Sequence, residues 1–186
     1  TYEVEFINAT YRRRPSVWQV LSRARRRVGV MGLPATYPPE TLNGFLISGF
    51  DSPVATKIGP SFVNPPELDE EIRRNVGPYW DIAGFQEIRI GPHWHERALR
   101  RLLQTVKRRV EVASYLLTRE RWDCFMVLFG ESDTVAHHFW AFHDRHSPRY
   151  DAAGAERFGD AILQVYRALD EAIERLVERA PRDTTV

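Results

Sequence analysis

The sequence predicts an α/β fold in which helices flank a mostly parallel sheet. Helical and strand-like segments alternate along the chain, and its strongest strand is a continuous apolar run of the kind found in parallel sheets. The 186 residues are 43% hydrophobic with a formal net charge of +1, which is typical of an ordinary soluble chain that can bury a core. We therefore expect residues 1–186 to form a single α/β domain or a fragment of one.

The first elements follow from apolar periodicity and turn residues. Ser16 precedes an apolar stripe that runs into the arginines of 23–27, which predicts a short helix with a serine N-cap and cations near its C-terminus. The apolar run 28–33 predicts a buried strand, and 45–50 predicts a second strand after a turn. The prolines of 34–40 exclude a helix between the two strands.

The middle of the chain is rich in proline and glycine. Residues 51–92 are expected to leave the sheet as an excursion, with one helical piece at 66–72 where proline and acidic residues stand at the start. Leucine, valine and alanine then recur every three or four residues, which predicts a long amphipathic helix over about 94–119.

The last third begins with the strongest strand. Residues 124–130 are continuously apolar, as in a strand buried on both faces. A second long helix is predicted over 158–177, ending near Pro181, and the closing residues 184–186 resemble the start of a further strand. A strand broken off there, and a first residue that is not methionine, lead us to expect an excerpt of a longer protein.

Composition excludes several classes of protein. The single Cys124 rules out a disulfide framework and a multi-cysteine metal site, and it fits a reducing compartment. No run approaches the roughly 18 apolar residues of a membrane helix. The 24 arginines are almost balanced by acids, whereas nucleic-acid binders usually have a basic excess. We therefore expect a cytoplasmic protein with no membrane and no nucleic-acid partner.

Polar chemistry is concentrated between Gly130 and Tyr150, directly after the strongest strand. Four of the six histidines lie there. The ends of parallel strands are the edge at which open α/β sheets bind ligands. Asp133 and His137 are four residues apart, so a helix beginning here would bring the two side chains to about 5–6 Å on one face, where they can share a metal ion. A catalytic zinc site usually has three protein ligands, so at least one more must come from elsewhere.

Five other side chains each have a functional and a structural interpretation. His138 points to another side of the helix, so core packing or a hydrogen bond to a ligand is favoured over metal binding. Asp144 and His146 either contact substrate or form a polar loop in which the aspartate is a cap. Thr36 and Tyr37 either line a substrate pocket or belong to a tight loop shaped by prolines.

Three further hypotheses remain open at this point. Glu131 and Asp133 could be an acid/base pair, although residues two apart seldom share a helix face. The helix 94–119 could belong to a non-catalytic, arginine-rich binding module, although interleaved acids favour a solvated face. A mononuclear metal site could be built locally from Asp133, His137, His143 and His146. For His93 and His95, helix capping or a surface position is favoured.

Two blocks of this sequence stand out as motifs. The first block contains Pro-Ser-Val-Trp at 15–18, Val-Gly-Val-Met-Gly-Leu-Pro-Ala-Thr-Tyr-Pro-Pro at 28–39 and Gly-Phe-Leu-Ile-Ser-Gly-Phe at 44–50. The second is Ser-Asp-Thr-Val-Ala-His-His-Phe-Trp at 132–140. Together they resemble the alkaline phosphatase superfamily, and most closely its type I phosphodiesterase/nucleotide pyrophosphatase branch, in which the second block is similar to an Asp-x-x-x-His metal-ligand segment. An alkaline-phosphatase-like fold is therefore expected.

This resemblance implies a metal-dependent hydrolase of small phosphate esters. Such enzymes hold two divalent ions, usually zinc and in some branches manganese, and the match implies that Asp133 and His137 bind one of them. The family's Ser or Thr nucleophile, the Asp ligand before it, its later Asp-His pair and its last His have no matching position here. We therefore expect the remainder of the same domain to complete the site, and residues 1–186 alone to be inactive.

Overall fold

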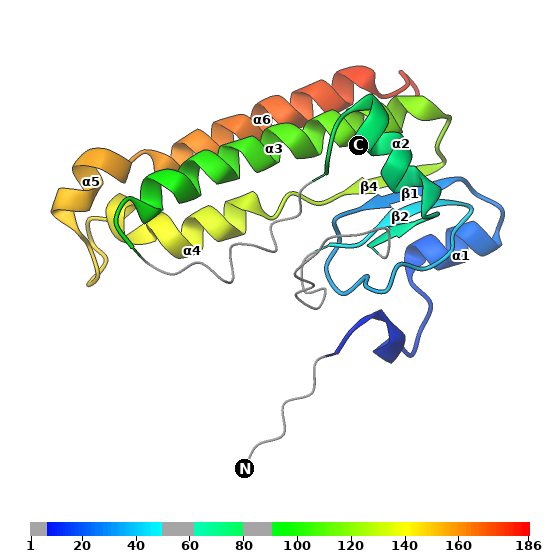
Figure 1. The fold of residues 1–186 in the computed structure, drawn as a ribbon, viewed down its shortest axis with the longest axis horizontal. Helices are drawn as coiled ribbons and strands as arrows, with labels where there is room; N and C mark the ends of the chain where they lie inside the picture. Colours follow the sequence, from blue (N-terminus) through cyan, green and yellow to red (C-terminus); the bar gives the residue numbers. More distant parts are fainter. Residues whose placement is uncertain (1–6, 50–61, 80–90) are drawn as a thin grey trace, which may run out of the picture. The chain divides into compact units, whose positions relative to one another are not determined.

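A four-stranded sheet forms the framework of the fold. The structure is a computed structural model that describes residues 7–49, 62–79 and 91–186. The strands are β1 (Val28–Met31), β2 (Gly44–Ile47), β3 (Val63–Asn64) and β4 (Cys124–Val127), in the order β3-β2-β1-β4 (Figure 1). β1 runs parallel to β2 and β4, and only β3 is antiparallel to its neighbour β2. The sheet with its flanking helices confirms the predicted α/β fold class.

The helices divide between two compact units. They are a 3-10 turn at Ala9–Tyr11, α1 (Val17–Arg23), α2 (Glu67–Asn75), α3 (Trp94–Arg119), α4 (Glu131–His143), α5 (Ala152–Phe158) and α6 (Ala161–Arg179). Unit 1 comprises residues 1–83 and 112–128, and unit 2 comprises 84–111 and 129–186. Helix α3 thus begins in unit 2 and ends in unit 1, and the prediction of a single domain stays a prediction.

In unit 1, the core lies on β1 and β2. Val28, Val30 and Leu46 are fully buried, and side chains from α1, the neighbouring loops and β4 pack on them: Trp18, Leu21, Leu33, Leu42 and Cys124. The predicted N-cap at Ser16 is confirmed, because its hydroxyl accepts a hydrogen bond from the Gln19 amide while the Gln19 side chain accepts one from the Ser16 amide. This reciprocal capping box satisfies two amides that the first turn of α1 leaves free.

The prediction for the strongest strand was only partly right. Residues 124–127 do form β4, but all four are half-buried, whereas the sequence predicted burial on both faces. β4 is an edge strand of the described sheet and pairs only with β1 there. Its other side has no strand among the described residues to cover it, which fits its half-burial. An apolar run alone does not reveal how many strands flank it.

One of two predictions for the C-terminal third is confirmed and the other is wrong. The long helix predicted over 158–177 is α6, which begins at Ala161 because Phe158 ends the short helix α5 and Gly159 and Asp160 separate the two. Residues 184–186 form no strand, since the Thr184 amide closes a turn onto the Pro181 carbonyl and Val186 is 92% exposed. Most of the predicted excursion at 51–92 lies outside the described residues, and its described part contains β3 and α2.

Unit 2 is built around α4. The buried stripe of α4 packs on α5 and α6, whose own buried residues include Phe158, Val165 and Leu169 (Figure 1). Within the described residues, no helix combines the length and the apolar character needed to cross a membrane.

Candidate functional site

The Asp133 and His137 side chains lie together on an exposed face of α4. Helix α4 starts at Glu131, four residues after β4 ends, so both positions are helical as the spacing predicted. The His137 Nε2 and Asp133 Oδ1 atoms are 3.4 Å apart, and each side chain is 73% exposed. A carboxylate and an imidazole are therefore brought together in solvent, on the helix that follows β4 in the chain.

The opposite face of α4 is buried and begins with a charged residue. Val135, Phe139 and Phe142 lie in the core. Glu131 extends the same stripe by one turn, and it is fully buried although its side chain is a carboxylate. The Arg109 Nε on α3 donates to Glu131 Oε1 at 3.2 Å, and Arg109 is itself only 3% exposed. Glu131 and Asp133 thus face different sides, which argues against the acid/base pair.

A local mononuclear site is not formed. Over residues 7–49, 62–79 and 91–186, no three His, Cys, Asp or Glu side chains lie close enough together to hold a metal ion. His143 instead points its Nδ1 to the Gly159 carbonyl at 3.3 Å, where α5 gives way to α6. The hypothesis that Asp133, His137, His143 and His146 share one ion is therefore wrong. The pair Asp133 and His137 has two donor groups and no third among the described residues.

His138 is exposed on α4 and contacts an aromatic ring, so the favoured core packing is not formed, and a hydrogen bond from His138 to a metal ligand stays a prediction. Its ring and that of Trp94 meet edge to face with centroids 4.9 Å apart. Burial lowers the pKa of His138 from its ordinary value of 6.5, and the neighbouring imidazoles of His137 and His95 lower it further. The neutral form, which the packing favours, keeps one ring nitrogen as an acceptor.

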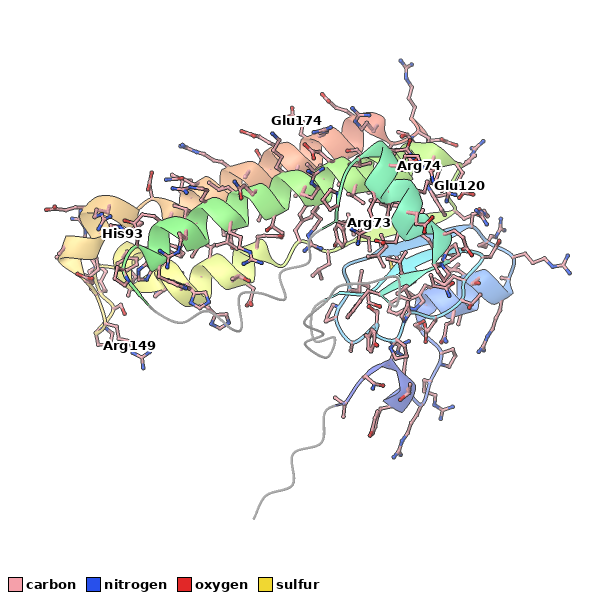
Figure 2. All side chains as sticks on the ribbon, viewed as in Figure 1. Arg73, Arg74, His93, Glu120, Arg149 and Glu174 are labelled. Atoms are coloured by element: carbon pink, nitrogen blue, oxygen red, sulfur yellow. The ribbon has the colours of Figure 1, made fainter. Side chains whose placement is uncertain are left out.

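His95 takes part in an aromatic cluster that the sequence did not reveal. Its ring lies 4.9 Å from that of Phe142 and 5.5 Å from those of Phe139 and Phe158, measured between centroids. Helix capping does not describe His95, which is the second residue of α3, and the predicted surface position holds only in part because His95 is half-buried. Both interpretations hold better for His93, whose side chain is 76% exposed at the start of α3 (Figure 2).

The half-buried His95 makes stability depend on pH. Burial lowers its pKa below 6.5, an effect that Glu96 and Asp151 partly oppose. The unfolded chain therefore takes up more protons than the folded chain as the pH falls through about 6.5, and the free energy of unfolding decreases. We expect the urea midpoint to fall between pH 7.5 and pH 5.5, and a His95→Phe variant to show a shallower decline. An unchanged slope in this variant would contradict the assignment.

The segment after α4 is a local turn. Asp144 is the C-cap residue of α4, and its Oδ1 accepts a hydrogen bond from the His146 amide at 2.9 Å. Such an Asx turn explains an aspartate at this position without a ligand. The interpretation of Asp144 as a cap in a polar loop is thus favoured, and substrate contact by Asp144 or His146 stays a prediction.

Thr36 and Tyr37 hold their loop together within unit 1. The Thr36 hydroxyl donates to the Leu33 carbonyl at 2.6 Å and accepts from the Gly49 amide at 3.1 Å, and Thr36 is 1% exposed. The half-buried Tyr37 lies with its ring 4.8 Å from that of Phe62. Both side chains have structural partners, which favours the loop interpretation. Their place in a substrate pocket stays a prediction.

Many arginines are paired with acids on the surface of each unit. Arg73 of α2 contacts Asp69 at 2.7 Å, and Arg119 of α3 contacts Glu71 at 2.8 Å. Further ion pairs join Arg108 to Glu111, Arg27 to Glu120 and Arg157 to Glu96. This self-neutralised surface supports the solvated-face interpretation of α3 over the binding module.

Comparison with known proteins identifies the family. The model of the type I phosphodiesterase / nucleotide pyrophosphatase family matches residues 3–186, which is almost the whole chain. We found no match among curated proteins or solved structures. Members of the matched family are hydrolases that act on phosphate esters or nucleotides and generally require metal. The chain belongs to the type I phosphodiesterase / nucleotide pyrophosphatase family.

Proposed function

We propose that this chain contributes half of one metal site to a metal-dependent phosphodiesterase or pyrophosphatase, with Asp133 and His137 as ligands of one of two divalent cations. The observation that carries the proposal is the 3.4 Å separation of His137 Nε2 and Asp133 Oδ1 on the exposed face of α4. Membership of a family of phosphoric ester hydrolases gives that pair a chemical role.

The donor atoms and their spacing suit zinc or manganese. Zinc binds imidazole nitrogen and carboxylate oxygen at about 2.0–2.2 Å, so two ligands at a tetrahedral angle are separated by about 3.4 Å. The Oδ1–Nε2 distance has this value, which supports the two atoms as ligands of one cation. Manganese accepts the same carboxylate and imidazole donors.

The position of Asp133 on α4 stabilises its negative charge. Asp133 lies in the first turn of the helix, where a negative side chain is stabilised by the amide dipoles. Its exposure leaves room for the remaining ligands, which must come from outside the described residues. A bound cation of this kind neutralises charge on phosphoryl oxygens and lowers the pKa of water. In this proposal Asp133 supplies the charge and His137 the neutral donor.

A metal-dependent assay of the full-length enzyme tests this proposal. The protein is stripped with a chelator and then assayed with a phosphate diester, bis(p-nitrophenyl) phosphate, and with the corresponding monoester. We expect chelation to abolish hydrolysis, and Zn²⁺ or Mn²⁺ to restore it while Ca²⁺ does not. Hydrolysis that persists in the metal-free protein would contradict the proposal.

A further inference from the structure

The first turn of α4, which contains Asp133, has little to hold it in place by itself. Its N-cap residue is Gly130, and no side chain caps the turn. The Thr134 amide and the Thr134 hydroxyl both donate to the Gly130 carbonyl at 3.1 Å, so these hydrogen bonds at the start of the helix stay within the turn itself. A helix end without a side-chain cap frays more readily.

One buried ion pair supplies the missing anchor. The hydrogen bond from Arg109 Nε to Glu131 Oε1 joins a side chain of the first turn to another helix, α3. Both partners are buried, Arg109 at 3% and Glu131 at 0% exposure. Glu131 Oε2 is also buried and has no hydrogen-bond partner among the described residues. An apolar side chain at position 131 would leave no such unsatisfied oxygen atom. The buried ion pair therefore carries a cost that apolar packing at this place would avoid.

The ion pair is directional in a way that apolar packing is not. Successive residues of a helix are about 100° apart, so Glu131 and Asp133 point to nearly opposite sides while His137 lies about 40° from Asp133. Any rotation of the first turn about the helix axis moves Asp133 by the same angle. Further along α4, Phe139 is held by aromatic contact with His95, but Asp133 lies almost two turns before it.

We infer that Arg109 and Glu131 are positioning residues that fix the rotation of the first turn of α4 and so hold Asp133 beside His137 in the geometry that a metal ion requires. This inference rests on the proposed function, because holding Asp133 in place matters for metal binding only if Asp133 is a metal ligand. Glu131 would act from the opposite face of the same turn. Buried ion pairs are retained for specificity of conformation in some proteins, although apolar replacements are often as stable.

A charge-neutral double variant tests the inference in the full-length protein. Arg109→Met with Glu131→Leu removes one positive and one negative charge, so the field at Asp133 changes little while the directional contact is lost. We expect the variant to fold, with a melting temperature near that of the wild type. The dissociation constant for Mn²⁺, measured by electron paramagnetic resonance, should rise about tenfold, as expected when a contact that orients a ligand is lost.

A measurement without metal keeps this test separate from the proposed function. In the metal-free double variant, amide exchange by NMR should accelerate at least tenfold at Thr134, in the first turn. The Asp144 amide, which donates to Trp140 at 3.1 Å at the far end of α4, serves as the internal control and should not change. If the wild-type protein binds no Mn²⁺ at Asp133 and His137, the proposed function is contradicted. If amide exchange at Thr134 is the same in the double variant as in the wild type, the positioning role of Arg109 and Glu131 is overturned.

A second variant, Glu131→Gln, tests the positioning role if the double variant does not fold. Glu131→Gln keeps an acceptor of the same length for Arg109 but weakens the contact, because a neutral amide accepts a weaker hydrogen bond than a carboxylate. Faster exchange at Thr134 with an unchanged Asp144 amide supports the inference. Wild-type exchange at both amides overturns it.

Discussion

Replacing Asp133 or His137 by alanine is expected to remove one metal ion from the enzyme and to lower its turnover by more than about 100-fold, since even the loss of a residue that only orients a metal ligand costs 10–100-fold. The two side chains lie 3.4 Å apart and are 73% exposed, so neither is needed for the core. Metal content is measured by mass spectrometry of the purified protein, and turnover with a phosphate diester.

Stability measurements separate this loss from a folding defect. Both side chains are on the surface, where substitutions usually change the free energy of unfolding by less than about 0.5 kcal/mol. The melting temperature of the metal-free Asp133→Ala and His137→Ala variants should therefore match that of the metal-free wild type. An Asp133→Asn variant, which keeps the shape and removes the charge, should lose the metal as well.

His143→Ala is the matched control on the same helix. His143 is also an exposed imidazole of α4, but its Nδ1 lies 3.3 Å from the Gly159 carbonyl, away from Asp133 and His137. This variant should keep its metal and most of its turnover. Full metal content in both the Asp133→Ala and His137→Ala variants would refute the assignment of the ligands.

The elements that the sequence predicted well are those determined by residues close together in the chain. A serine followed three residues later by glutamine predicts a helix start, and Ser16 and Gln19 do form the capping box. The four-residue spacing of Asp133 and His137 likewise places both on one face of α4. These local relations need no knowledge of the rest of the fold.

The features that the sequence missed depend on contacts between distant segments. The half-burial of β4 follows from its place at the edge of the described sheet, which an apolar run does not encode. The environment of His95 is built from rings of α4 and α5, about 45 and 60 residues further along the chain. A histidine between Trp94 and Glu96 gives no sign of aromatic neighbours so far along the chain.

Glu131 is the most instructive omission. It stands in the polar segment after β4, and its type suggests a solvated or catalytic carboxylate. Only the helical register shows that it continues the buried stripe of Val135, Phe139 and Phe142. Its partner Arg109 comes 22 residues earlier, in a helix whose arginines were assigned to solvent. A carboxylate at a stripe position, with an arginine on a nearby helix, is the signal that could have revealed the pair.

Replacing Arg109 by alanine is expected to destabilise the protein by about 3–5 kcal/mol, because it leaves the buried Glu131 charge without its partner. Urea denaturation followed by circular dichroism measures the change. The double variant Arg109→Met with Glu131→Leu should recover most of this loss, since it removes both buried charges and replaces them with apolar volume.

Arg108→Ala provides the comparison, because Arg108 is the adjacent residue of α3 and also contacts a carboxylate. Arg108 Nη1 lies 3.1 Å from Glu111 Oε2, but the two side chains are 29% and 26% exposed. Water screens such a pair, so its loss should cost at most about 1 kcal/mol. If Arg109→Ala is no more destabilising than Arg108→Ala, Glu131 has found water or another donor, and burial of the pair does not control the stability of α4. A large difference between these neighbours shows that the cost arises from burying a carboxylate in the turn that contains Asp133.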